Sequence, residues 1–412
     1  MTRLLALLTV LAMLASACTS AGETQPDRSP NDCPQAYADG LNDWAAAGFS
    51  GTIAITREGE LECAAGYGSA DRADDRANTP QTVYSIGSVS KAFTAAAIYR
   101  LVDDHRLRLD DTAGAILPSL RGPAAHATVR QLLLHVSGLA GSIGPDHAPL
   151  SHAAAIRKLS TLRRAYAPGT HYLYSNAGYA LLALIIDKVS GNYRRFMTTR
   201  ILDAPGAVRS RGFWDGEPAA IGPRAVGYLD GGPTDQMGEF TGPHWALSGN
   251  GDLAMTTHDL AEWTYALFNG DILSQRSTRA ITTGQVARGD GASATPGWVR
   301  FPKQRYGEPV IATSGGGGDI GHDVVVAWLP RSRRVVAIAS NTPVTRAEDV
   351  LTAIGPTLVT EGAIPPPDEP RASVDPSELQ GVAGTYRLDQ RSSCEVSVHD
   401  DELAVTAHGR KA

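Results

Sequence analysis

The sequence predicts an α+β fold, in which helices and antiparallel strands form one domain. Two alternating apolar runs, 52–56 and 61–66, flank the turn residues Glu58 and Gly59, which is typical of a β-hairpin. A nearly continuous apolar stretch at 177–187 has the length of a helix and must be buried. Short loops join three β-prone runs near the end of the chain into an antiparallel meander: 310–313, 322–328 and 334–341.

The composition is that of an ordinary globular protein with room for one large domain and a small appendage. The chain has 412 residues, of which 42% are hydrophobic and 19% are charged. A formal net charge of −6 and the lack of a dense basic run argue against nucleic acid as a partner. No cluster of cysteine and histidine has the spacing of metal ligands, so no metal site is expected.

Residues 1–18 have the features of an export signal. A charged start precedes the apolar run 4–14 and several small residues, a pattern too short and too poorly flanked for a spanning helix. The small residues directly before Cys18 resemble a bacterial lipobox, which predicts a lipid on Cys18 and attachment to the outer face of the cytoplasmic membrane. Ala15 is less typical of a lipobox than leucine, so secretion without a lipid stays open. Residues 19–34 would then tether the domain.

Three cysteines remain beyond Cys18, so at least one of them has no partner within the chain. An exported protein can form disulfides. We favour a bond between Cys33 and Cys63, because both fall in the first segment of the domain, and this pairing leaves Cys394 over.

The main domain is expected to span residues 35–360. It opens with a helix at 35–47 and closes with a helix at 345–360. Residues 361–378 are rich in proline, which predicts a stiff, extended linker. The segment 379–412 contains three β-prone runs but is too short to bury a core alone, so it would dock on the main domain or mark a truncated barrel.

The stretch Ser88-Val89-Ser90-Lys91 is the first candidate for chemistry. It follows the β-prone segment 84–87 and enters an alanine-rich run, so a helix that begins at Ser88 would place Ser88 and Lys91 on one face. A serine hydroxyl needs an adjacent base to act as a nucleophile. A lysine has a reference pKa of ~10.4, so serving as a base near pH 7 requires a shift of ~3 units, or about 4 kcal/mol. The spacing alone fits an N-cap serine with a solvated lysine as well.

Two later stretches add polar groups at fixed places. Tyr174 and Asn176 lie between the turn 167–170 and the buried helix, where a rigid scaffold can present chemistry. An interface aromatic and an N-cap asparagine are the alternative interpretation. The four glycines 315–318, at the first corner of the meander, permit close approach by a ligand and present N–H groups to an anion. A flexible loop would explain the same glycines.

His135 could be a catalytic base, but a structural role fits it better. It ends the short amphipathic run 129–135 and stands close to Gly138, where a helix stops. An imidazole is favourable at a helix C-terminus, where it caps the last carbonyls. We therefore expect His135 to affect stability more than chemistry.

Taken in order, these motifs resemble the serine β-lactamase and penicillin-binding-protein superfamily, in its class C-like branch of serine hydrolases, esterases and D-amino-acid peptidases. The likeness spans about residues 35–360 and includes further matching motifs at 133–139, 168–170 and 251–260. It implies a five-stranded antiparallel sheet flanked by helices, joined to a helical subdomain, with the site in the cleft between them.

The resemblance also implies residue roles. Ser88 would be the acylated nucleophile, Lys91 its activating partner and Tyr174 the general base and acid. Asn176 would hydrogen-bond Lys91 and the substrate amide. The N–H of Ser88 and one from the Gly316–Gly317 region would form the oxyanion hole. The expected substrate-binding positions are Asn176, Ser314, Gly315, Gly316 and Gly317, and no metal or organic cofactor is needed.

One departure from the superfamily concerns the substrate. Its members usually begin the third motif with lysine or histidine, and here Ser314 or Gly315 stands at the matching position. Uncharged esters or amides should therefore react better than β-lactams or D-amino-acid peptides, unless arginine or histidine from elsewhere compensates, with His322 the nearest candidate in sequence. The expected function is an exported serine acyl hydrolase acting on a small-molecule or peptide substrate. The alternative is a non-catalytic binder or sensor that uses the same cleft.

Overall fold

The computed structural model describes most of the chain in two compact units, one ending at Pro365 and the other beginning at Pro366. The described residues are 31–145, 148–204, 210–229, 232–234, 243–289, 291–316, 320–342, 344–368, 384–387, 392–399 and 402–409. The export signal with Cys18, most of the predicted linker, and Gly317 lie outside these residues.

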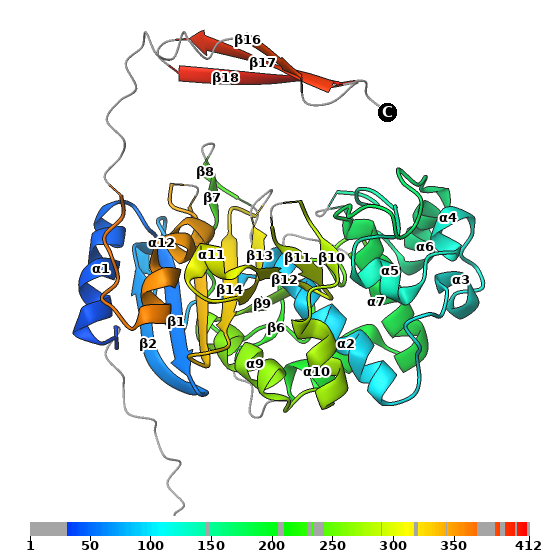
Figure 1. Cartoon of the computed structure of the whole chain (residues 1–412), viewed down its shortest axis with the longest axis horizontal. Helices are drawn as coiled ribbons and strands as arrows, with labels where there is room; N and C mark the ends of the chain where they lie inside the picture. The colour runs from blue at the N-terminus through cyan, green and yellow to red at the C-terminus, as the bar shows by residue number, and fades with distance from the viewer. Residues whose placement is uncertain are drawn as a thin grey trace, which may run out of the picture. The chain divides into compact units, whose positions relative to one another are not determined.

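An eight-stranded antiparallel sheet forms the centre of the first unit (Figure 1). Its strands, in spatial order, are β10 (Val286–Ala287), β11 (Ser293–Thr295), β12 (Trp298–Phe301), β13 (Val310–Gly316), β14 (Asp323–Leu329), β15 (Arg334–Ser340), β1 (Gly51–Arg57) and β2 (Glu60–Tyr67). The hairpin β1–β2 and the meander β13–β15 confirm the sequence prediction. They join where β1 pairs with β15, with Ile53 opposite Ile338.

The sheet is larger than the five strands that the resemblance implies. Those five form one contiguous part of it, and β10–β12 extend it beyond β13. These three strands were not predicted from the sequence, because each has only two to four residues. Strand β15 is buried at every position, since helices cover both faces of the sheet at that point.

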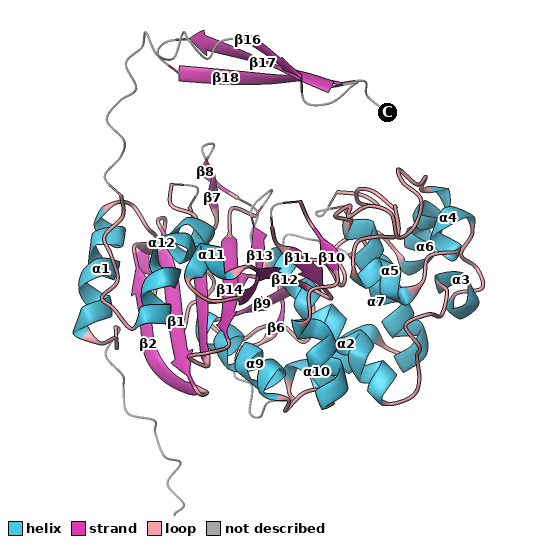
Figure 2. Ribbon diagram, viewed as in Figure 1, coloured by secondary structure: helices cyan, strands magenta, loops and turns pink. Residues whose placement is uncertain are grey.

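Helices cover the two faces of the sheet in separate layers (Figure 2). One face carries α1 (Gln35–Ala46) and α12 (Ala347–Thr360), whose apolar side chains pack on the large aliphatic residues of β1 and β15. The other face carries α2 (Ser90–Asp103) and α9 (Thr257–Asn269). Both terminal helices of the domain were predicted within two residues of their observed bounds.

A helical region packs beside the sheet and is built around α7. The remaining helices are α3 (Ala113–Ile116), α4 (Gly122–Ala125), α5 (Val129–Leu133), α6 (His152–Thr161), α7 (Asn176–Ser190), α8 (Tyr193–Phe196), α10 (Gln275–Thr282) and α11 (Lys303–Tyr306), with a π-helical turn at Met197–Leu202. Helix α7 is buried without interruption from Ala177 to Ile186, because α2, α3, α5 and α6 surround it. This confirms the predicted core helix. Within the described ranges, no helix has both the length and the apolar character needed to cross a membrane.

Short strands complete the first unit. They form three small antiparallel sheets: β3 (Ser69–Asp71) with β4 (Arg76–Ala77); β5 (Tyr84–Ser85), β9 (Leu253–Met255) and β6 (Gly212–Phe213); and β7 (Tyr228–Leu229) with β8 (Gly232–Pro233). The sheet of β5, β9 and β6 matters for the site, because β5 leads directly into the turn that contains Ser88. Its pairing of Ser85 with Ala254 brings the Gly251–Leu253 segment next to that turn.

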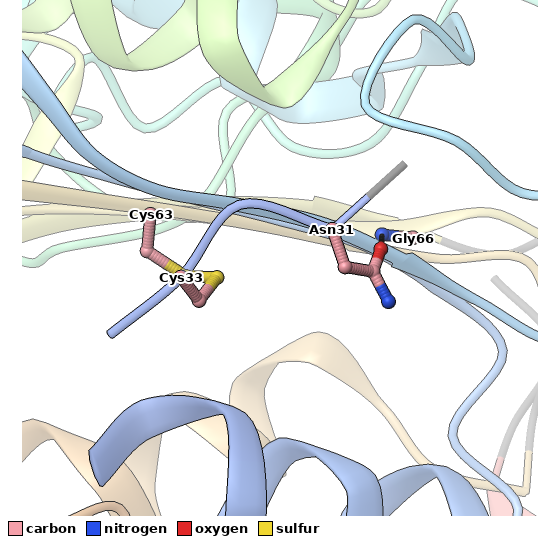
Figure 3. Close-up of a disulfide and its surroundings, with 4 residues drawn as sticks. All are labelled: Asn31, Cys33, Cys63 and Gly66. Atoms are coloured by element: carbon pink, nitrogen blue, oxygen red, sulfur yellow. Dashed lines mark hydrogen bonds between the residues drawn. A yellow bond between two sulfur atoms is a disulfide. The ribbon is translucent and has the colours of Figure 1, made fainter. Parts of the chain in front are cut away.

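A disulfide joins Cys33 to Cys63, as favoured from the sequence (Figure 3). It ties the segment before α1 to strand β2. Two neighbouring contacts hold the same segment: Asp32 and Ala64 exchange backbone hydrogen bonds, and Gly66 N donates to Asn31 Oδ1. The start of the domain is thus fixed to the edge of the main sheet.

The first residues after α12 also pack on the domain. Ile364 is buried, and its N–H donates to the carbonyl of Ala36. The indole of Trp44 donates to the carbonyl of Pro365 at 3.0 Å. A Cβ on Gly40 would lie 2.1 Å from Ile364 O, so the close passage of this segment over α1 requires glycine there.

The second unit contains a three-stranded antiparallel sheet. Its strands are β16 (Gly384–Arg387), β17 (Ser392–His399) and β18 (Glu402–Gly409), in that spatial order. The three β-prone runs expected after residue 379 are therefore strands, and each neighbour in sequence is a neighbour in the sheet.

Candidate active site

Ser88 lies in a tight turn just before α2. The turn, Gly87–Val89, is a 3₁₀ helix, and α2 begins at Ser90, two residues later than predicted. Ser88 and Lys91 still lie on the same side, because residues three apart line up along a 3₁₀ helix as they do on one face of an α-helix. Ser88 is partly exposed, whereas Lys91 is buried, with 3% of its surface accessible.

The three predicted catalytic side chains meet at the Ser88 hydroxyl. Lys91 Nζ donates a hydrogen bond to Ser88 Oγ at 2.8 Å, and Tyr174 OH donates to the same oxygen at 2.7 Å. The ammonium group of Lys91 also lies 4.8 Å from the centre of the Tyr174 ring. Two donors on one hydroxyl oxygen stabilise negative charge on it, which is what a serine nucleophile requires.

A backbone carbonyl that the sequence did not predict holds the other side of Lys91. Lys91 Nζ donates to Asn250 O at 3.0 Å. The turn that presents this carbonyl is closed by the buried carboxylate of Asp252, which accepts from Gly249 N at 3.2 Å and from Tyr193 OH at 3.0 Å. Burial raises the pKa of Asp252 to about 6. The Asn-Gly pair in this segment indicated a turn, but nothing in the sequence indicated the partner of its carbonyl.

The expected contact between Lys91 and Asn176 is not formed. Asn176 Oδ1 is buried and has no hydrogen-bond partner among the described residues. Asn176 is not the N-cap either: Ser175 caps α7, and its Oγ accepts from Gly178 N at 3.0 Å. The carbonyl of Asn250 occupies the acceptor role that the resemblance gave to Asn176.

His135 supports the loop that carries Tyr174. It does not cap α5, because that helix ends at Leu133 and His135 follows its C-cap in the left-handed region, at φ 56°. Its Nδ1 accepts from Ser175 N at 3.1 Å, and its ring stacks on the Tyr174 ring with centroids 4.7 Å apart. Burial, together with the nearby charges of Lys91 and Arg288, lowers the pKa of His135 to about 3. It is therefore a neutral positioning residue for the tyrosine.

Strand β13 reaches the backbone around Ser88 at Gly315. A Cβ on this residue would lie 2.4 Å from both Ile86 O and Ser88 N. Because side chains alternate along a strand, Thr313 lies on the same face as this contact and Ser314 on the opposite face. The residue of the third motif that lies on the Ser88 side is therefore Thr313, not Ser314, and it carries no charge. Gly316 ends the strand beside the Ser88 turn, since a Cβ on Gly87 would lie 3.2 Å from Gly316 N.

His322 does not supply the missing cation. It is almost fully buried, its Nδ1 accepts from Ser85 N at 3.1 Å, and its ring packs edge-on against Trp214 and Tyr84. Burial lowers the pKa of His322 to about 4, so it is neutral at physiological pH. The interpretation of His322 as a compensating charge is wrong, because its ring belongs to the packing beneath the Ser88 turn.

A cavity of about 470 Å³ opens beside Ser88 and Tyr174. Strand β12 pairs with β13 only as far as Ala312, so within the described part of the chain the edge of 313–316 has no strand partner on that side, and it lines the cavity. Three arginines also line it: Arg288, Arg305 and Arg346. Two hydrogen bonds at 3.0 and 3.1 Å pair Arg346 with Asp323. Among the described residues, no group of acidic, cysteine and histidine side chains could hold a metal ion.

Comparison with known proteins gives one consistent family. The family model Beta-lactamase matches residues 42–357. A penicillin-binding protein of Bacillus subtilis (strain 168) is 24% identical over 385 residues, 88% of this chain and 84% of the relative. The teichoic acid D-alanine hydrolase of Staphylococcus aureus is 30% identical over 173 residues, 41% of this chain and 42% of the relative.

The fold has close counterparts among solved structures. The octameric penicillin-binding protein homologue of Pyrococcus abyssi superposes with a TM-score of 0.69 at 23% identity, over 89% of this chain and 88% of that one. Three curated relatives that share 30% or 31% identity with the chain align with it over 42% to 61% of their own length.

Proposed function

The chain belongs to the beta-lactamase family, whose relatives here are penicillin-binding-protein-like serine hydrolases, and we propose that it cleaves ester or amide bonds through an acyl-enzyme on Ser88. One observation carries this proposal. Ser88 Oγ stands at the mouth of the cavity within hydrogen-bond distance of both Lys91 Nζ and Tyr174 OH. A hydroxyl so placed has beside it a cation and a phenol oxygen, and the phenol oxygen can accept the serine proton once it has lost its own, which is the arrangement that activates a serine nucleophile.

Acylation follows from the positions of these groups. Tyr174, in its unprotonated form, takes the proton of Ser88 as Oγ forms a bond to the substrate carbonyl carbon. The Lys91 ammonium, 4.8 Å from the centre of the Tyr174 ring, stabilises the negative charge of that form. The carbonyl electron pair moves to oxygen, next to the N–H groups of Ser88 and Gly316. When the bond to the leaving group breaks, the leaving group takes the proton back from Tyr174.

Deacylation reverses these roles with water. Tyr174 is 45% exposed, so water can reach its oxygen from the cavity. The water loses a proton to Tyr174 while its oxygen attacks the ester carbon of the acyl-enzyme. The bond to Ser88 Oγ then breaks, and Oγ recovers a proton from Tyr174. Asn250 O keeps Lys91 in place throughout, because it accepts a hydrogen bond that does not involve the reacting atoms.

The substrate class is proposed as small acyl esters and amides, including D-amino-acid derivatives. The teichoic acid D-alanine hydrolase among the relatives supports the D-amino-acid part. β-Lactams share the amide chemistry, and the uncharged third motif leaves their carboxylate without a lysine or histidine contact. Turnover of a short p-nitrophenyl ester should therefore exceed that of a chromogenic cephalosporin, and the reverse order would show that an arginine of the cavity lining holds the carboxylate.

We also propose that the protein acts outside the cytoplasm, at the outer face of the cytoplasmic membrane or in the surroundings. The export features of residues 1–18 support this location, and Cys18 would carry the lipid in the membrane-bound case. Expression of the full chain and of Cys18→Ser, followed by separation of membrane and soluble fractions, tests it. If both proteins are exported and both are found in the soluble fraction, the protein is secreted and Cys18 carries no lipid.

Mass spectrometry after incubation with a fluorophosphonate tests the acyl-enzyme. We expect one adduct, on the peptide that contains Ser88, and none on Ser88→Ala. The same pair of proteins should differ in hydrolysis of p-nitrophenyl acetate. If no adduct forms and no ester is hydrolysed, while ligands still raise the melting temperature, the chain is a binding protein and not an enzyme.

A further inference from the structure

The segment 249–253, which presents Asn250 O to Lys91, is fastened to helix α2 at several points. Three hydrogen bonds join the two, namely Thr94 Oγ1 to Gly249 O at 2.8 Å, Lys91 Nζ to Asn250 O at 3.0 Å and Leu253 N to Ser90 Oγ at 3.2 Å. All the residues in these bonds are buried. The position of Asn250 O is therefore set by the shape of the whole segment.

The residue types of this segment restrain its backbone poorly. Gly249 and Gly251 flank the carbonyl that holds Lys91. Gly249 adopts φ 79°, in the left-handed region, and a Cβ there would lie 2.8 Å from Tyr179 O of α7. Glycine loses more conformational freedom on folding than any other residue, so fixing this segment costs more than fixing an ordinary one. A further restraint is needed to keep Asn250 O in one place.

Asp252 supplies that restraint from within the segment. Its carboxylate accepts from Gly249 N at 3.2 Å, which closes the segment on itself, and from Tyr193 OH at 3.0 Å, which ties the segment to α8. An ionised carboxylate has only acceptors, so it takes both hydrogen bonds at once. Asp252 is 5% exposed and Tyr193 3%, and neither lines the cavity beside Ser88. Both residues therefore act from behind the site.

Lys91 depends on the carbonyl that this segment presents. Its ammonium is buried, and a buried charge is costly unless hydrogen-bond acceptors surround it. Ser88 Oγ is one acceptor, but this oxygen becomes part of the ester when the acyl-enzyme forms. Asn250 O is an acceptor that the reaction leaves unchanged. If this carbonyl moved, the flexible four-carbon stem of the lysine would let the ammonium leave the nucleophile.

We propose that Asp252 is a positioning residue for the reaction at Ser88, with Tyr193 as its partner. Asp252 acts through two links, because it fixes the carbonyl of Asn250 and that carbonyl fixes the ammonium of Lys91. The inference rests on the proposed function, since it gives two more residues a role in the same acyl-enzyme chemistry. Neither residue contacts the reacting atoms. Their loss should therefore slow the attack on substrate and leave substrate binding unchanged.

Asp252→Ala and Tyr193→Phe test this role in the full chain. With p-nitrophenyl acetate, we expect Asp252→Ala to lower kcat roughly tenfold or more and to leave KM within about twofold, because the lysine is displaced while the cavity is intact. The rate of fluorophosphonate labelling of Ser88 should fall by the same factor. Tyr193→Phe removes one of the two hydrogen bonds and should lower kcat about threefold. Asp252→Asn keeps an oxygen that can accept from Gly249 N, so it should recover part of the activity that alanine loses.

The Lys91→Ala background shows whether Asp252 acts through the lysine. Adding Asp252→Ala to Lys91→Ala should change the remaining labelling rate by less than about twofold, because no ammonium is left to position. A carboxylate that only stabilised the fold would lower the rate by the same factor in both backgrounds. Equal losses in the two backgrounds would therefore overturn the inference.

Glu308→Ala is the matched control, because it also removes a buried carboxylate that accepts from a backbone N–H. Glu308 is 1% exposed and accepts from Arg331 N at 3.0 Å, outside the cavity lining. Its loss should keep kcat within about twofold even if the melting temperature falls. Melting temperatures show which variants are folded, and if Asp252→Ala does not fold, Tyr193→Phe and Asp252→Asn decide the result.

The outcomes separate this inference from the proposed function. If the unaltered protein hydrolyses p-nitrophenyl acetate and the folded Asp252 and Tyr193 variants keep kcat within about twofold, the positioning role is wrong and the acyl-enzyme stands. If the unaltered protein hydrolyses no ester and forms no adduct on Ser88, the proposed function itself is wrong.

Discussion

Gly315→Ala should disable the nucleophile without touching any catalytic side chain. The added methyl group would lie 2.4 Å from Ile86 O, 2.4 Å from Ser88 N and 2.5 Å from Val89 N. All three atoms belong to the backbone of the turn that carries Ser88, so no side chain can rotate away to make room. Gly315 itself is in ordinary strand geometry, so the substitution adds a contact without straining its own backbone.

The magnitude follows from the displacement that relieves this contact. Ordinary van der Waals separation requires β13 and the Ser88 turn to move apart by about 1 Å. A misplacement of about 1 Å at an active site lowers the rate by roughly 10²-fold. Forcing an extra methyl group into a packed position costs about 1–3 kcal/mol of stability, which a domain of this size should survive.

The assay compares kcat/KM for p-nitrophenyl acetate with the rate of fluorophosphonate labelling of Ser88. Both should fall together by roughly 10²-fold in Gly315→Ala, since both report attack by the same oxygen. Gly144→Ala is the matched control, because a methyl group there meets only Lys158 Nζ, at 3.6 Å. A folded Gly315→Ala protein that is labelled within threefold of the unaltered rate would refute the idea that β13 fixes the nucleophile.

Three further predictions concern proton transfer, pH and the disulfide. Lys91→Ala and Tyr174→Phe should each lower kcat by roughly 10²-fold or more, as expected for positioned proton transfer, and near-normal turnover by either would remove that residue from the mechanism. The pKa of His322 is about 4 in the folded chain and ~6.5 when unfolded, so its stabilising effect is full above pH 6.5 and is lost as the pH falls toward 4. Urea unfolding should show that the free energy of unfolding falls between pH 7 and pH 5 by about 2 kcal/mol more in the unaltered protein than in His322→Gln. Equal losses in the two proteins would contradict the lowered pKa of His322. Replacing Cys33 and Cys63 by serine should cost about 3–4 kcal/mol, because the bond closes a loop with a sequence separation of 30, and an unchanged urea midpoint would show that the bond does not form.

The sequence determined those features that depend on neighbours along the chain. The three-residue spacing of Ser88 and Lys91 places them together in any helical turn, even though the helix begins at Ser90. The hairpin β1–β2 and the meander β13–β15 follow from turns that join adjacent runs. The burial of α7 follows from its lack of a polar face. The order of the motifs was enough to indicate the family and the nucleophile.

The sequence could not predict which backbone groups form part of the site. The carbonyl of Asn250 holds Lys91, but every residue has a carbonyl, so its role has no signature in the residue type. Asn176, whose amide suggested that contact, does not make it. The strands β10–β12 were missed because short strands are stabilised by their partners more than by their own residues.

Tertiary structure alone decided which side chains reach the cavity. His322 follows the glycine corner closely in sequence, yet it is packed beneath Ser85 and Trp214. The lining of the cavity brings together Val299 and Leu351 from a strand and a helix that are far apart in the chain. Such placements depend on strand register and on the close approach of packed elements, which are set by the whole core. The sequence by itself therefore determined the family and the pairing of Ser88 with Lys91, and the packing of β13 against its neighbours decided the shape of the cavity beside them.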